Sequence, residues 1–77
     1  MDLLDEILIT PKAYRNWERT VQRQVQKLTN KGYKPEQIPD EQAEVLEDNS
    51  LLLFVDLPNK RISMRISPED WSYIAEN

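Results

Sequence analysis

The chain of 77 residues has no cysteine, no histidine and a single glycine, Gly32. Without cysteine there is neither a disulfide nor a thiolate metal site, which is typical of a reducing compartment. Histidine is the most frequent general base near neutral pH and the commonest metal ligand, so its absence removes much catalytic chemistry. One glycine is too few for a Gly-rich phosphate-binding loop. We therefore expect a protein that is not an enzyme and that holds no cofactor or metal.

Long hydrophobic runs are also missing from the chain. No stretch approaches the roughly 18 apolar residues that cross a bilayer. Residues 2–6 carry acids where a signal peptide would carry basic residues. A chain of this length supports only one core, and without disulfides or metals it depends on good packing or on self-association. We therefore expect one cytoplasmic domain over residues 1–77, with no membrane partner and no evident small-molecule substrate.

The net charge of −4 conceals a division of the two signs along the chain. Seven of the ten basic residues lie within residues 12–34, where Glu18 is the only acid. The next stretch, residues 36–48, contains six acids and no base, among them Asp40, Glu41 and Glu44. Two such halves attract each other, or each serves a different partner.

Residues 11–31 are expected to form a long amphipathic helix. Thr10 is a suitable N-cap, Pro11 suits the first helical position, and Gly32 can take the left-handed conformation that ends a helix. At 100° per residue, the apolar side chains fall on one face: Tyr14, Trp17, Val21, Val25 and Leu28. The basic side chains fall on the opposite face.

Three further segments have weaker signals. Residues 2–8 place apolar side chains on one helical face and predict a short helical segment. Residues 68–75 predict a second helix, because Ser67 and Pro68 resemble a capped helix start and Asp70 a capping-box variant. Residues 43–47 fit a helical turn or a strand, since short runs do not discriminate by period. We expect a strand there, followed by a tight turn at 48–49.

Residues 50–56 and 61–66 predict a β-hairpin. With Pro58 and Asn59 as the central turn residues, one face of the hairpin becomes a fully apolar column, and a slip by one residue would destroy it. That column pairs Val55 with Ile62, Leu53 with Met64, and Leu51 with Ile66. The other face pairs Asp56 with Arg61, Phe54 with Ser63, and Leu52 with Arg65.

The first hairpin strand is therefore apolar on both faces. We expect Leu46 to join the face that the long helix covers, and Val45 to join Leu52 and Phe54 on the other face. The N-terminal segment, the C-terminal helix or a partner would then have to cover this second face. Left uncovered, it would be an apolar patch of the kind that marks interaction surfaces.

These patterns predict a small α+β domain, with a long amphipathic helix packed on a two- or three-stranded antiparallel β-meander and a short C-terminal helix. We expect a non-catalytic protein-interaction module, a regulator or inhibitor, that binds another protein or a second copy of itself. The residues expected to make the contacts are Leu52, Phe54, Arg65, Asp40, Glu41 and Glu44.

Two other functions remain open from the sequence. The basic helix face could bind the phosphate backbone of a nucleic acid through Arg15, Arg19, Arg23 and Lys27. Alternatively, the acidic stretch at 36–48 could make the chain an inhibitor of a nucleic-acid-binding protein. Both alternatives depend on charge, which determines association rather than fold.

Overall fold

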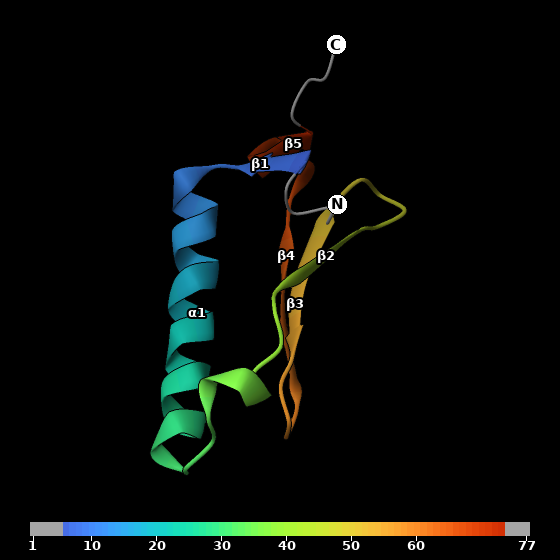
Figure 1. Cartoon of the computed structure of the whole chain (residues 1–77). Coiled ribbons are helices and arrows are strands. Elements are labelled where there is room, and N and C mark those ends of the chain that lie inside the picture. Colours follow the sequence, from blue (N-terminus) through green and yellow to red (C-terminus); the bar gives the residue numbers. More distant parts are fainter. Residues whose placement is uncertain (1–5, 74–77) are drawn as a thin grey trace.

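The computed structural model describes residues 6–73 as one small α+β domain. Its long helix, α1 (Pro11–Asn30), lies along one side of a three-stranded antiparallel sheet (Figure 1). In spatial order the strands of this sheet are β2 (Gln42–Val45), β3 (Leu51–Asp56) and β4 (Arg61–Ile66). Consecutive strands are thus neighbours, with β3 in the centre.

A second, two-stranded sheet lies at one end of the molecule, at the top of Figure 1. It pairs β1 (Ile7–Ile9) with β5 (Trp71–Tyr73) in antiparallel fashion, so the first and last described strands are neighbours. Two short 3₁₀ turns connect the larger elements, η2 (Pro35–Gln37) after α1 and η3 (Pro68–Asp70) before β5.

Both ends of α1 follow from the residues that flank it. Pro11 occupies the first turn, and the preceding Thr10 contributes its carbonyl oxygen, which accepts the Tyr14 N–H at 2.9 Å. At the other end Gly32 adopts a φ of 101°, which costs glycine little. This conformation lets the N–H of Gly32 reach the carbonyl of Thr29 at 3.0 Å and that of Tyr33 reach Leu28 at 3.1 Å. The two bonds form a Schellman cap.

The hairpin of β3 and β4 has the register that the sequence predicts. All six predicted pairs are observed, from Leu51 opposite Ile66 to Asp56 opposite Arg61. The Leu57 N–H donates to the Lys60 carbonyl at 2.8 Å and closes the loop around Pro58 and Asn59. The apolar column and the turn thus agree on this register.

The orientation predicted for the strand before the hairpin is wrong by one residue. Val45 pairs with Leu51, so Val45 shares the helix-covered face, and Leu46 lies just beyond the strand. The turn contains three residues, 47–49, instead of the two predicted. The Leu46 N–H donates to the Ser50 carbonyl at 2.8 Å across this loop, and Asn49 adopts a φ of 69°. Such a three-residue loop with a left-handed last residue shifts the pairing by one residue, so every side chain of β2 lies on the opposite face of the sheet from the one predicted.

Both predicted terminal helices are wrong within the described residues. Residues 7–9 form strand β1 instead of the end of a helix, while residues 2–5 lie outside the described part. The helix predicted over 68–75 begins as η3 after Ser67 and then continues as β5, and residues 74–75 lie outside. The Asp70 carbonyl accepts the Thr10 N–H at 2.8 Å, so pairing with β1 takes the place of a helical turn.

The core lies between α1 and the inner face of the three-stranded sheet. Trp17 and Leu28 provide its fully buried helix side chains, with Val21 partly buried beside them. The sheet contributes Leu51, Leu53, Val55, Ile62 and Ile66. Tyr14, expected on the apolar helix face, is 39% exposed. Trp71 packs against this core from β5, partly buried, and donates its indole N–H to the Asn49 carbonyl at 2.9 Å.

Candidate functional site: the open face of the sheet

The side of the three-stranded sheet that faces away from α1 is the strongest candidate site, and we call it the open face. Figure 1 shows no described helix or strand lying on this side. Side chains alternate between the two faces along a strand, so the strand register shows which residues point away from α1 and lie on the open face. These are Gln42 and Glu44 from β2, Leu52, Phe54 and Asp56 from β3, and Arg61, Ser63 and Arg65 from β4.

The open face is ordered by charge across the strands. Leu52 lies in the centre of one row, between Glu44 on β2 and Arg65 on β4. In the next row Phe54 lies between Gln42 and Ser63. The apolar side chains therefore follow the central strand, with Glu44 on one side of them and bases on the other, and Asp56 at the end of the central strand faces Arg61. Val45, which was predicted to lie here, is replaced on this face by Glu44.

Arg61 is held over the apolar centre. Its guanidinium carbon lies 4.3 Å from the centroid of the Phe54 ring, a cation–π arrangement. The same group donates to both carboxylate oxygens of Asp56, at 2.5 and 3.0 Å. The hydrogen bond from Arg61 lowers the pKa of Asp56, and the reciprocal contact raises the pKa of Arg61. The sequence predicted that Asp56 and Arg61 face each other, but not the stacking on Phe54.

Arg65, the third predicted contact residue, also has a partner. Its guanidinium forms an ion pair with Asp48 in the turn between β2 and β3. The Asp48 carboxylate additionally accepts the Ser50 N–H at 3.0 Å, which fixes the turn. Both members of the ion pair remain about half exposed or more, so the interaction is a weak one. Arg65 is therefore oriented but still accessible.

The three acidic residues predicted to assist these contacts are divided by the structure. Glu44 lies on the open face, whereas Asp40 and Glu41 line a cavity of about 320 Å³ between α1 and the segment after η2. The pKa of the Tyr14 hydroxyl on α1 is raised, first by the negative charge of Glu41, then by burial and by Glu18. Asp40 and Glu41 thus belong to the helix side of the sheet.

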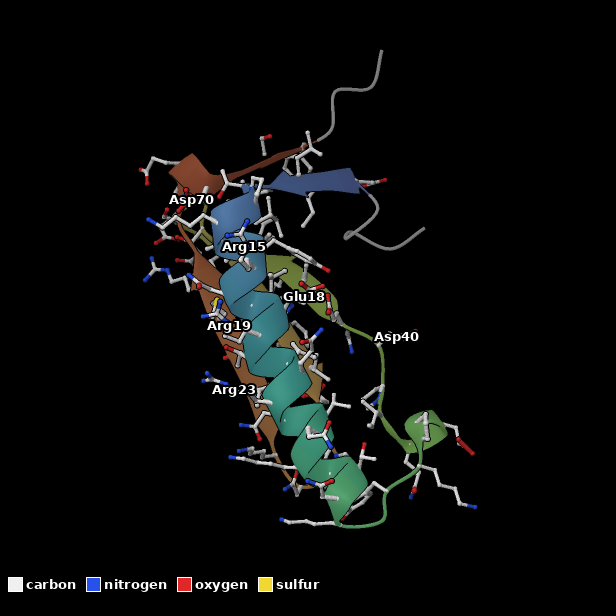
Figure 2. All side chains as sticks on the ribbon, turned by 90° about the vertical axis from the view of Figure 1, so that its left-hand side faces the viewer. Arg15, Glu18, Arg19, Arg23, Asp40 and Asp70 are labelled. Atoms are coloured by element: carbon white, nitrogen blue, oxygen red, sulfur yellow. The ribbon has the colours of Figure 1, made fainter. Side chains whose placement is uncertain are left out.

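The basic residues of the alternative site lie on the far side of α1. Arg15, Arg19 and Arg23 follow one another down the front and left side of the helix in Figure 2, and Lys27 is exposed in the next turn. Glu18 points to the other side of the helix, towards the segment that contains Asp40 (Figure 2). The basic helix face and the open face are therefore separated by the whole thickness of the molecule.

Other kinds of site find little support in the described residues. Within residues 6–73 no group of three or more Asp or Glu side chains is placed to hold a metal ion. Over the same residues, no helix combines the length and the apolar character needed to cross a membrane.

Comparison of the chain with protein-family models, with curated proteins and with solved structures found no match.

Proposed function

We propose that this protein is a non-catalytic protein-interaction module that docks its partner on the open face. One observation carries this proposal: Leu52 and Phe54 lie half-buried in the centre of a sheet face on which no described element packs. Large apolar side chains at the centre of an otherwise polar surface mark interaction sites.

The composition of the open face also fits an interface. Binding energy concentrates in a few central residues, and aromatic and arginine side chains are enriched among them. Phe54 and Arg61 are such a pair and are already stacked, so little side-chain entropy is lost when a partner covers them. The polar residues at the edges, such as Glu44 and Arg65, would form the solvated rim.

Site-specific photo-crosslinking tests the proposal. A benzophenone side chain would replace exposed Ser63 on the open face, or exposed Gln22 on α1 as the matched control, and cells that express the protein would be irradiated. We expect a discrete protein adduct from position 63 that is absent from position 22. Phe54→Asp should abolish the adduct, because a desolvated carboxylate at the centre of the interface is costly.

Leu52→Lys is a second disruptive variant in case Phe54→Asp fails to fold, which circular dichroism would show. Equal adducts from positions 63 and 22 would contradict the proposal. So would an adduct from position 63 that survives both substitutions.

A second function, nucleic-acid binding, is favoured by a different observation. Arg15, Arg19, Arg23 and Lys27 are all exposed on α1, and in the described chain none of them has an ion-pair partner. Four phosphate contacts to duplex DNA would give a slope of roughly −3 to −4 for log K against log salt. A mobility-shift titration of the wild type and of a variant with all four changed to Ala measures this slope. Absence of binding at about 50 mM salt would exclude this function.

The third function, an acidic inhibitor of a nucleic-acid-binding protein, has less structural support. Glu44 lies on the open face and Asp40 and Glu41 lie on the helix side. These residues do not combine into one acidic surface.

A further inference from the structure

We propose that the occupant of the open face is a second copy of this chain, stacked sheet on sheet about a two-fold axis that runs parallel to β3. This inference rests on the proposed function, since it names the partner of the same surface. It follows from the order of charges across the strands and from the position of the apolar residues on the central one.

A two-fold rotation about an axis parallel to the strands exchanges the two edges of the sheet. The β2 edge of one copy then lies over the β4 edge of the other. Glu44 and Arg65 are in the same row, on either side of Leu52, so Glu44 of each copy comes to lie over Arg65 of the other. Leu52 is on the axis and meets its own counterpart. Phe54, with Arg61 stacked on its ring, and Asp56 are on the axis as well, and in each copy the Arg61–Asp56 pair is neutral as a whole. The row of Glu44, Leu52 and Arg65 is therefore self-complementary in both charge and apolarity.

The other two-fold stacking lacks this property. An axis across the strands places β4 over β4, and Arg61 and Arg65 of one copy then approach the same two arginines of the other. Like charges facing each other across an interface are unfavourable and exclude wrong arrangements. The order of charges on the open face thus selects one orientation.

The dimensions of the face also fit such a stack. Packed sheets are separated by about 10 Å and rotated by about 30°, and long Glu and Arg side chains can follow this rotation. β3 and β4 have six residues each and β2 has four, so each copy contributes roughly 250 Å². A stable complex usually buries about 800 Å² on each side, so we expect a weak, reversible dimer.

Sedimentation equilibrium up to about 1 mM protein is the appropriate measurement for such a weak dimer. We expect concentration-dependent dimerisation of the wild type and its loss in Phe54→Asp. Glu18→Arg on α1 is a matched control for Glu44→Arg, an open-face variant described below, because both substitutions change the net charge by the same amount. It should leave the dissociation constant unchanged.

A charge-swap series then tests the orientation. It is best made in an Asp48→Asn background, because Asp48 pairs with Arg65 within one chain and Asn can still accept the Ser50 N–H. Glu44→Arg alone and Arg65→Glu alone should each raise the dissociation constant about tenfold, since two attractive pairs become repulsive. The double variant should return to within about threefold of the background, because the pairs are restored.

Three results would overturn the inference, and each is distinct from failure of the proposed function. A wild type that stays monomeric at about 1 mM excludes a second copy as the occupant, whereas an adduct of position 63 with a different protein would still support docking on this face. A dimer that Phe54→Asp does not affect forms through another surface. A dimer that Phe54→Asp disrupts but the double swap does not restore has another orientation.

Discussion

The two faces of β3 carry side chains of the same kind in different surroundings. Leu51, Leu53 and Val55 point towards α1 and are at most 1% exposed, while Leu52 and Phe54 alternate with them and are only partly buried. Both sets are apolar, yet only the first has a described element packed on it (Figure 1). An apolar residue in a strand therefore does not by itself identify the core; the element opposite it does.

This difference separates stability from binding within one strand. Full burial of a large apolar side chain contributes about 1.5–3 kcal/mol to folding, and partial burial proportionally less. We therefore expect substitutions on the helix-covered face to unfold the protein and those on the open face to change association instead.

The sharpest comparison is Leu53→Ala against Leu52→Ala, two adjacent residues that point in opposite directions. Leu53→Ala should lower the free energy of unfolding by about 2–5 kcal/mol, because it leaves a cavity in a close-packed core. Leu52→Ala should cost about 1 kcal/mol, since part of that side chain already contacts water. Urea denaturation of the two variants measures both values. Equal losses would show that the open face is covered in solution.

Trp17→Phe examines the helix-covered face from the opposite side. Trp17 is fully buried and its indole N–H has no hydrogen-bond partner in the described structure. The substitution loses packing but also removes an unsatisfied donor, which is itself unfavourable, so we expect a net loss of about 1 kcal/mol. Thermal unfolding followed by circular dichroism gives the value. A loss as large as that of Leu53→Ala would mean that the N–H has a partner.

On the open face, Phe54→Leu retains an apolar side chain but removes the ring under Arg61. The expected loss is about 0.5 kcal/mol, as for other cross-strand pairs in a sheet. A double-mutant cycle with Arg61→Ala, measured by urea denaturation, isolates the stacking. Additive losses would show that Arg61 and Phe54 do not interact in solution.

The smallest expected effect concerns pH. Because Arg61 lowers the pKa of Asp56 in the folded protein, ionised Asp56 favours folding. This contribution is complete above the ordinary aspartate pKa of about 4 and disappears as the pH falls through the lowered value. The difference in melting temperature between wild type and Asp56→Asn should therefore be present at about pH 7, decrease as the pH falls below about 4, and shrink in high salt. A difference that is constant with pH would contradict the pairing.

The parts of the fold that the sequence predicted well are those with redundant signals. α1 has a proline at its start, a glycine after its end and a separated apolar face, and all three agree. The β3–β4 hairpin has a turn and an apolar column that independently specify one register. Leu52, Phe54 and Arg65 were placed together on one face for the same reason.

The secondary-structure predictions that were wrong each depended on a single sequence signal. β1 and β5 contain three residues each, too few for a period of two to be distinguished from a helical one. Ser67 and Pro68 do begin a turn of helix, but the distant pairing with β1 then ends it. For β2, one extra turn residue, Glu47, with Asn49 in a left-handed conformation, placed the side chains of the strand on the opposite faces from those predicted. Local sequence contains no signal for long-range pairing or for a one-residue difference in loop length.

The pairing of β1 with β5 has a consequence for how the chain closes. Ile7 lies opposite Tyr73, so the beginning and the end of the described chain are neighbours in space. The described domain can form fully only after β5 has been synthesised, and the loop that its pairing with β1 closes includes almost every other described residue. A circular permutant that links the two ends and opens the chain elsewhere would convert this most distant contact into a local one and should fold faster.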